Sequence, residues 1–297
     1  MACACFITLI RNNNNHKKKQ KLTAMKKIFI MLLALAAIAP AAVAQKVTVT
    51  KEAKTLNTQW NGKTAVYLGD SMTDSKSTAT TCMYWAYLEE LMGIKPLVYG
   101  INGHQWDGVL QQAKKLKADN PKFDAIFIFA GTNDFNNNTA IGSFYNEDYV
   151  RTRKNNDPQA LLRHRTLNTN TNTFTGRINN VLSYLKDNFP DKQIIIMTPI
   201  HRALADFGKD NYQPTEDYAN YQRHFVDEYV QTLREASSIW SMPCIDLFAE
   251  SGLYPLSKPN LIYFHDAGMD QLHPNYLGNY RIARVMQFKL LSIPPTF

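Results

Sequence analysis

Short runs of apolar residues alternate along most of the chain with longer stretches in which apolar and polar positions are mixed. Such runs predict buried strands, and five stand out: Thr64–Gly69, Leu97–Ile101, Phe123–Ala130, Gln193–Thr198 and Pro243–Phe248. Between them apolar residues recur at helical spacing, as at Phe174, Ile178, Val181, Leu182 and Leu185. Alternating strands and helices predict an α/β fold, a three-layer α/β/α sandwich around a five-stranded parallel sheet. Residues 45–297 show no internal repeat and are expected to form a single domain.

One segment, from Asp134 to Thr173, departs from this regularity. It is rich in Asn, Thr and charged residues and holds only a brief apolar patch around Ala160 to Leu162. Loops of this length are uncommon in compact domains unless they are lids or binding loops. The segment is therefore either a lid over a site or a surface excursion with a short helix, and the pattern does not choose between them.

The N-terminal 44 residues have the pattern of a leader. Met25 and two lysines precede an apolar run from Ile28 to Ala39, and Ala42-Val43-Ala44 forms a cleavage site with small residues. This order predicts a bacterial secretory signal peptide over 25–44, cut after Ala44, in a protein that is secreted or periplasmic. The apolar run is shorter than the roughly 20 residues of a membrane span. Residues 1–24 add nothing that a signal needs, and we set them apart as a candidate mis-assigned start.

Charge and cysteine content narrow the function of the remaining body. The net charge is +8, but seven of the 33 basic residues and none of the 25 acidic ones lie in residues 1–44. The body therefore has 26 basic and 25 acidic residues. It lacks the excess of positive charge that a nucleic-acid binder needs. Its cysteines, Cys82 and Cys244, form either one disulfide or, the favoured interpretation, two buried thiols. No cysteine follows the cleavage site, so a lipid anchor is not expected.

Two short motifs hold candidates for nucleophilic catalysis. Gly69-Asp70-Ser71 ends the first predicted strand and places a hydroxyl at a strand-to-helix turn, although serines after strands are often helix caps. Near the C-terminus, Asp270 precedes His273 by three residues, so the carboxylate could hold Nδ1 while Nε2 faces the serine. The alternative makes this pair a cap and a turn before a helix that begins near Asn275. His265 and His104 are rival bases.

The ends of the next two predicted strands offer hydrogen-bond donors. Gly131-Thr132-Asn133-Asp134 presents a neutral amide, and Gly100-Ile101-Asn102-Gly103 presents a backbone N–H without a Cβ beside it. A tetrahedral intermediate needs two or three fixed donors around its developing charge, which Asn133 Nδ2 and the N–H groups of Gly103 and Ser71 could supply. Three successive strands would thus end in a nucleophile and two donors of an oxyanion hole.

These blocks resemble the SGNH hydrolases, also called the GDSL family of esterases, lipases and acyl hydrolases, from about residue 64 to 290. The resemblance names Ser71, Gly103, Asn133 and His273 as the signature residues and Asp270 as the third member of the triad. It implies a flavodoxin-like sandwich and no cofactor. Met72 replaces the usual Leu or Ile, and His104 and Trp106 follow the glycine where smaller or polar residues are commoner, which makes these two candidates for substrate binding.

The expected function is that of an exported serine esterase that works through an acyl-enzyme. Export and the polar segment after Asp134 favour a short-chain O-acetyl esterase acting on carbohydrate, with Tyr84, Trp85 and Trp106 as candidate cleft aromatics; hydrolysis of lipid acyl esters is the alternative. A metal-assisted hydrolase would instead use His265, Asp266, Asp270 and His273. A non-catalytic carbohydrate-binding protein would use exposed tryptophans among Trp60, Trp85, Trp106 and Trp240. We expect neither a metal nor another cofactor.

Overall fold

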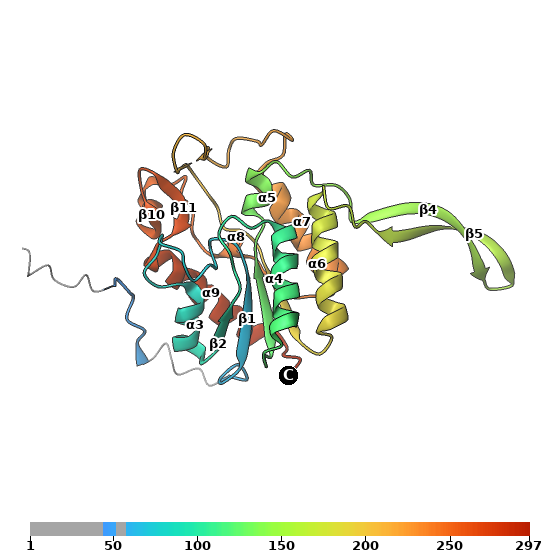
Figure 1. Cartoon of the computed structure of the whole chain (residues 1–297), viewed down its shortest axis with the longest axis horizontal. Helices are drawn as coiled ribbons and strands as arrows, with labels where there is room; N and C mark the ends of the chain where they lie inside the picture. Colours follow the sequence, from blue (N-terminus) through green and yellow to red (C-terminus); the bar gives the residue numbers. More distant parts are fainter. Residues whose placement is uncertain (1–43, 52–57) are drawn as a thin grey trace, which may run out of the picture. The chain divides into compact units, whose positions relative to one another are not determined.

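Five parallel strands form the central sheet of the molecule, in the order β2-β1-β3-β6-β9 (Figure 1). They are β1 (Thr64–Gly69), β2 (Lys95–Val98), β3 (Ala125–Phe129), β6 (Gln193–Met197) and β9 (Cys244–Ile245). The predicted five-stranded parallel sheet is confirmed. Only β1 has its predicted bounds: β3, β6 and β9 are shorter than their predicted runs, whereas β2 begins two residues before its predicted run and ends three residues before the end of that run. The computed structural model describes residues 44–51 and 58–297, so the predicted signal peptide, apart from Ala44, lies outside the described residues.

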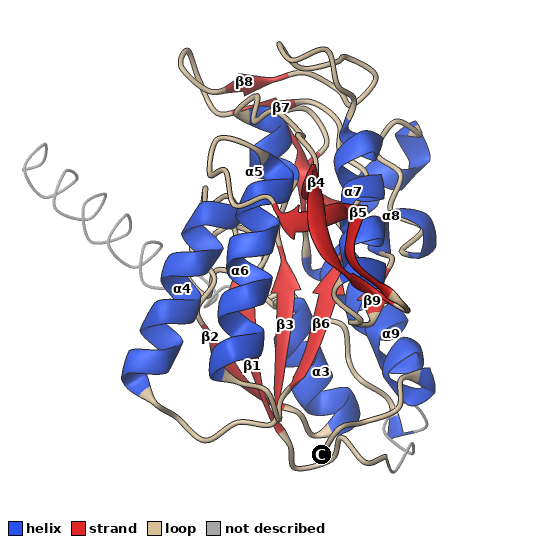
Figure 2. Ribbon diagram, turned by 90° about the vertical axis from the view of Figure 1, so that its right-hand side faces the viewer, coloured by secondary structure: helices blue, strands red, loops and turns tan. Residues whose placement is uncertain are grey.

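Successive side chains of each strand point to opposite faces of the sheet and enter two separate cores. In β1, Ala65 and Tyr67 pack on one face, whereas Val66 and Leu68 pack on the other. Figure 2 shows the helices that cover these faces. They are α3 (Tyr84–Met92) and α9 (Tyr276–Ser292) on the first face, and α4 (Trp106–Asp119), α6 (Phe174–Asn188) and α7 (Val226–Ile239) on the second. The fold is therefore the expected three-layer α/β/α sandwich.

The sheet has its topological switch point beside β1. The chain passes from β1 to β2 on one side and then returns to β3 on the other. In open α/β sheets, ligands bind outside the carboxyl ends of the strands at such a point. Short helices follow the ends of central strands: α5 (Thr132–Asn136) comes after β3, and α8 (Leu247–Glu250) and the 3₁₀ helix η1 (Lys258–Tyr263) come after β9. Ser71 follows β1 and Asn133 follows β3, so the switch point brings together two of the predicted site residues.

A second, antiparallel sheet in the order β10-β11-β7-β8 lies at the carboxyl end of the first (Figures 1 and 2). Its strands are β7 (Ala205–Asp206), β8 (Tyr212–Gln213), β10 (Phe264–Asp266) and β11 (Asp270–Pro274). The predicted triad residues Asp270 and His273 therefore lie on a strand, not on a loop or a turn. Asn275 caps α9, which begins at Tyr276, in agreement with the helix expected near Asn275. Strands of two to five residues are too short to show an alternating pattern in the sequence.

The polar segment after Asp134 forms a hairpin of two long strands, β4 (Tyr145–Lys154) and β5 (Asp157–Leu167). Nearly every residue of both strands is exposed, and the hairpin extends away from the sandwich in Figure 1. Its two ends meet where the Asn168 N–H donates to the Phe144 carbonyl at 2.9 Å. The buried Asn179 amide also donates to both carbonyls of this pair, at 2.9 and 2.8 Å. Of the two alternatives, the segment is thus the surface excursion and not the lid, and it is built from a long hairpin.

Cys82 and Cys244 are both free, so they do not pair with each other, although Cys244 is only partly buried. Within the described ranges, no helix is long and apolar enough to cross a membrane.

Candidate active site

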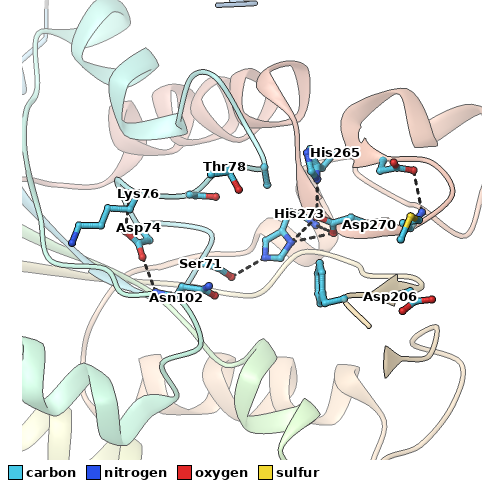
Figure 3. A pocket seen from close by; sticks show the side chains of 14 residues that line it. Ser71, Asp74, Lys76, Thr78, Asn102, Asp206, His265, Asp270 and His273 are labelled. Atoms are coloured by element: carbon cyan, nitrogen blue, oxygen red, sulfur yellow. Dashed lines mark hydrogen bonds and ion pairs between the residues drawn. The ribbon is translucent and has the colours of Figure 1, made fainter. Parts of the chain in front are cut away.

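Ser71, His273 and Asp270 lie in a row at the switch point (Figure 3). The Ser71 Oγ lies 2.9 Å from His273 Nε2. On the far side of the ring, His273 Nδ1 lies 3.0 Å from both carboxylate oxygens of Asp270. In this arrangement a base contacts the serine hydroxyl, and a carboxylate contacts the base. Such a row of groups activates a serine as a nucleophile.

The turn that carries Ser71 is held tightly against the sheet. A Cβ on Gly69 would lie 2.3 Å from the Phe129 carbonyl oxygen, so only glycine lets β1 approach β3 this closely. Beyond the serine, the Thr73 hydroxyl bonds to the Tyr84 hydroxyl at 3.0 Å, and Trp85 Nε1 donates to the Thr73 carbonyl at 3.1 Å. The next helix begins only at Tyr84, so Ser71 lies in a turn followed by a loop and not at the predicted strand-to-helix turn. Tyr84 and Trp85, two of the three aromatic residues predicted to border the cleft, instead anchor this loop.

Asp70 lies buried directly before the nucleophile, with 1% of its surface exposed. Its Oδ1 accepts a hydrogen bond from the Met72 N–H at 3.0 Å, which closes the turn around Ser71. Burial raises the pKa of Asp70 to about 7, and the Met72 N–H and the charges of His273 and Arg202 oppose this rise. Asp70 is therefore a structural carboxyl whose charge is disfavoured.

Asp270 has the opposite electrostatic character. Burial disfavours its charge, but hydrogen bonds from the side chain and the backbone N–H of His273, together with one from His265, lower its pKa below the ordinary value. The His265 Nδ1 lies 3.0 Å from Asp270 Oδ2. Asp270 is thus held as a carboxylate, which is the state that can orient the His273 ring.

The candidate oxyanion donors line one pocket with the serine and the histidine. Ser71, Gly103, Asn133 and His273 all border this pocket, whose volume is about 570 Å³. Gly103 has a φ of +76°, a left-handed conformation that favours glycine, and a Cβ there would meet no atom within 4 Å. Among the described residues, neither its N–H nor that of Ser71 has a hydrogen-bond partner. Asn133 Nδ2 donates to the His104 carbonyl at 3.1 Å, which leaves its second N–H for the pocket.

A buried ion pair joins the loops that carry these donors. Asp134 is fully buried; its Oδ1 accepts from Arg177 Nη1 at 2.9 Å and its Oδ2 from the Trp106 N–H at 3.0 Å. Burial raises the pKa of Asp134 to about 7, although Arg177 opposes the rise. Arg177 also donates to Gln105 Oε1 at 2.6 Å. The ion pair thus fixes the loop after Gly103 against the helix that carries Asn133.

Neither candidate substrate-binding residue of the second block lies where it was expected. Trp106 is fully buried and packs edge-on against Phe174, so its indole cannot stack on a sugar. His104 Nδ1 lies 3.0 Å from Gln112 Nε2. It lines a different pocket, bordered by β2 and α4, and not the pockets that contain Ser71. Both assignments are corrected, because a sequence position near the oxyanion glycine does not determine which way a side chain points.

The structure also shows the positions of the other tryptophans and of the candidate metal ligands. Trp60 is fully buried, and Trp85 and Trp240 are half-buried with their indole N–H groups bonded within the protein. The Asp266 carboxylate accepts the N–H groups of Gly268 and Met269, at 2.7 and 3.0 Å. Over residues 44–51 and 58–297, no group of three or more His, Cys, Asp or Glu side chains is placed to hold a metal ion.

Comparison with known proteins agrees with this geometry. The model of the GDSL-like lipase/acylhydrolase family matches residues 67–281. The chain belongs to this family of ester-hydrolysing enzymes. A search among curated proteins finds no significant match. Solved structures with a similar fold include a protein from Lactobacillus plantarum, 23% identical, with a TM-score of 0.61 over 77% of this chain and 97% of its own. A possible lipase from Chitinophaga pinensis is 18% identical, with a TM-score of 0.56 over 78% of this chain and all of its own.

Within this GDSL-like site, the structure adds residues that the sequence analysis missed. Phe207 is 44% exposed, and its ring centroid lies 5.6 Å from that of His273. It borders both pockets that contain Ser71. Asn136 and Asn211 border the pocket of the oxyanion donors. Phe207 and Asn211 lie between two strands of two residues each, and no sequence pattern marks that loop as part of the site.

Proposed function

We propose that this protein is an exported serine esterase that removes acetyl groups from a carbohydrate. Ser71 attacks the ester carbonyl while His273 takes its proton, and Asp270 orients the imidazole and stabilises its positive charge. The N–H groups of Ser71 and Gly103 and the amide of Asn133 stabilise the oxyanion. His273 then protonates the leaving alcohol, and water hydrolyses the acyl-enzyme by the reverse sequence of proton transfers. The 2.9 Å contact between Ser71 Oγ and His273 Nε2 supports this mechanism.

The observation that carries the choice of a carbohydrate is the amide-rich pocket beside the nucleophile. Apart from the triad and oxyanion residues, its polar lining consists of Asn102, Asn136, Asn137, Asp210, Asn211 and Gln213. The side chains of Asn102, Asn136 and Asp210 have no partner among the described residues. Amides and carboxylates together donate and accept hydrogen bonds, which suits the hydroxyl groups of a sugar. The exposed ring of Phe207 at the edge of this pocket offers an apolar face for a pyranose.

Hydrolysis of a lipid acyl ester is the second candidate, with the same triad. It is favoured by the second pocket around Ser71, about 530 Å³ in volume, which is bordered by Phe207 and Met269. These side chains are 44% and 56% exposed and would give an acyl chain an apolar wall. That pocket also contains Asp74, Lys76 and Asp206, whose charges oppose a long hydrocarbon chain.

A chain-length series separates the two candidates. p-Nitrophenyl esters from acetate to dodecanoate would be assayed beside acetylated xylan and other acetylated glycans, with released acetate measured directly. We expect the highest kcat/KM at acetate, acetate release from at least one glycan, and loss of both in Ser71→Ala and His273→Ala, whose folding is checked by thermal melting. Activity that rises beyond about eight acyl carbons, without acetate release from any glycan, would support the lipid candidate. Ester hydrolysis that persists in Ser71→Ala would contradict the mechanism.

A further inference from the structure

Asp270 is shared by two imidazoles (Figure 3). His273 Nδ1 lies 3.0 Å from each of its oxygens, and His265 Nδ1 lies 3.0 Å from Oδ2. Oδ1 also accepts the backbone N–H groups of His273 and Leu272, at 3.0 and 3.3 Å. Oδ2 has only the two imidazoles as partners within the described residues. A serine triad needs one histidine on its carboxylate, so the second contact requires a separate explanation.

The local strand pairing brings His265 to this position. In the antiparallel pair β10–β11, Phe264 is opposite Pro274 and Asp266 is opposite Asp270, with a register shift between them. A single residue of β10, His265, therefore lies opposite three residues of β11, 271–273. Bulges of this kind re-aim side chains and are common next to active sites. The shift directs the His265 ring at the carboxylate that lies on the neighbouring strand.

The exposure of His265 speaks against a role in core packing. Its side chain is 45% exposed, whereas that of Asp270 is only 7% exposed. A half-exposed ring buries little apolar surface. Its hydrogen bond, however, supplies a partner to a buried carboxylate oxygen, and a buried oxygen without a partner destabilises the fold. Two backbone N–H groups hold Oδ1, and the contact of His265 with Oδ2 adds a further anchor against rotation of the carboxylate about the Cβ–Cγ bond.

We propose that His265 is a positioning residue for the triad, an inference that rests on the proposed serine esterase mechanism. With its proton on Nδ1, His265 donates to Asp270 Oδ2 and, together with the two backbone N–H groups on Oδ1, fixes the rotation of the carboxylate. The carboxylate in turn fixes the plane of the His273 ring and the direction of its Nε2 toward Ser71. His265 touches no reacting atom, so it acts only through Asp270.

Two variants of His265 test the donor itself. Leucine removes the hydrogen bond, whereas the Nδ2 of asparagine can take the place of the imidazole Nδ1. With p-nitrophenyl acetate, we expect kcat of His265→Leu to fall on the order of tenfold with an unchanged KM, since contacting groups couple to this degree. His265→Asn should stay within about threefold of the wild type. His224 forms a second histidine–carboxylate pair, with Glu228 at 3.1 Å, outside the site. His224→Leu is therefore the matched control and should leave kcat unchanged.

A double-mutant cycle tests whether the effect passes through Asp270. In an Asp270→Asn background, His265→Leu should cause no further loss of kcat, because the carboxylate that it orients is gone. An unchanged kcat in His265→Leu, a rise in KM alone, or an equal loss in both backgrounds would overturn the proposal. The rise in KM would identify His265 as a substrate contact, since it borders a pocket with Ser71.

A covalent probe separates this inference from the proposed substrate. The rate at which a fluorophosphonate labels Ser71 reports activation of the serine without any ester substrate. Labelling that is lost in Ser71→Ala and slowed about tenfold in His265→Leu would support the positioning role even if no tested ester is hydrolysed. Labelling at the wild-type rate in His265→Leu would overturn it even if the esterase assignment holds.

Discussion

Buried polar side chains hold the site at the scale of single residues. Arg202 has 1% of its surface exposed, and its Nη1 donates to the Thr132 hydroxyl at 3.0 Å. The Arg202 backbone N–H donates to Glu216 Oε2 at 2.8 Å. Thr132 directly precedes Asn133, so this buried chain of contacts supports the turn that presents the oxyanion amide. Preorganised donors of this kind need no rearrangement when charge develops during the reaction.

Asn133 gives the sharpest test of that arrangement. Asn133→Ala should lower kcat by a factor on the order of 10²–10³ with little change in KM, because the amide acts on the developing charge and not on the bound ester. Steady-state kinetics with p-nitrophenyl acetate measure both constants. Asn133→Asp keeps the shape but replaces the donor with an acceptor, and it should lose at least as much. A rise in KM alone would make Asn133 a ground-state contact.

Asp70 predicts a dependence of stability on pH. Its pKa is raised to about 7 in the folded protein and is near 3.9 in an unfolded chain, so the folded state holds the proton over the interval between these values. The contribution of Asp70 to the free energy of unfolding is therefore fully present below pH ~4. It falls as the pH rises toward 7, by up to about 4 kcal/mol. In Asp70→Asn, whose amide oxygen can still accept the Met72 N–H, this loss is absent.

Thermal melting measures that effect. The Tm of Asp70→Asn minus that of the wild type should increase from pH 5 to pH 8. If the Tm–pH curves of the wild type and Asp70→Asn were parallel, Asp70 would ionise as readily in the folded state as in the unfolded one, which would contradict the prediction.

At the scale of elements, the β4–β5 hairpin and the sandwich are nearly separate. The hairpin residues are exposed on both faces, so the strands bury little surface against the sandwich. Its base, in contrast, is fixed by Asn179, which is fully buried and whose Oδ1 accepts from Trp240 Nε1 at 3.0 Å.

We predict that the hairpin can be removed without loss of the fold. Replacing residues 146–166 by a short Gly-Ser turn should shift Tm by no more than a few degrees, about the effect of 1 kcal/mol, and leave hydrolysis of p-nitrophenyl acetate within about twofold. Asn179→Ala is the contrasting variant, since it removes the amide that donates to the Phe144 and Asn168 carbonyls and accepts from the Trp240 indole, and it should destabilise by about 1–3 kcal/mol. A deletion that unfolds the sandwich would contradict the prediction.

The sequence predicted those elements whose pattern reflects burial. Thr64–Gly69 is buried on both faces and was predicted with its bounds, whereas the hairpin strands are exposed on both faces and show no alternation. Five candidate site residues could be predicted because the motifs follow strand ends or lie three residues apart. Trp106 was misjudged because a large aromatic near a glycine looks the same in sequence whether it points into the core or into a cleft. His265 was considered only as a rival base or a metal ligand, because its contact with Asp270 depends on a register shift.

At the scale of the whole molecule, the domain is expected to begin at Gln45. The first residues after the predicted cleavage site already contact the body: the Val47 N–H donates to the Tyr87 hydroxyl at 3.0 Å, and Val49 is 8% exposed. Expression in a bacterial host should therefore release the protein into the periplasm or the medium, with the intact mass of a chain that begins at Gln45. Ala44→Leu should block the cut and retain the precursor. A full-length chain in the cytoplasm would contradict the predicted export.

The hairpin also makes the protein convenient to label. Its tip, at Asn155 and Asn156, is the exposed turn of a ribbon that extends away from the sandwich (Figure 1). Cys82 is buried and Cys244 half-buried, and burial raises the pKa of both thiols, which keeps them poorly reactive at neutral pH. A cysteine introduced at Asn156 in the mature chain would therefore react with maleimide far faster than either native thiol. A dye or a solid support attached there would sit at the end of the ribbon, away from Ser71, with the entrance to the site left open.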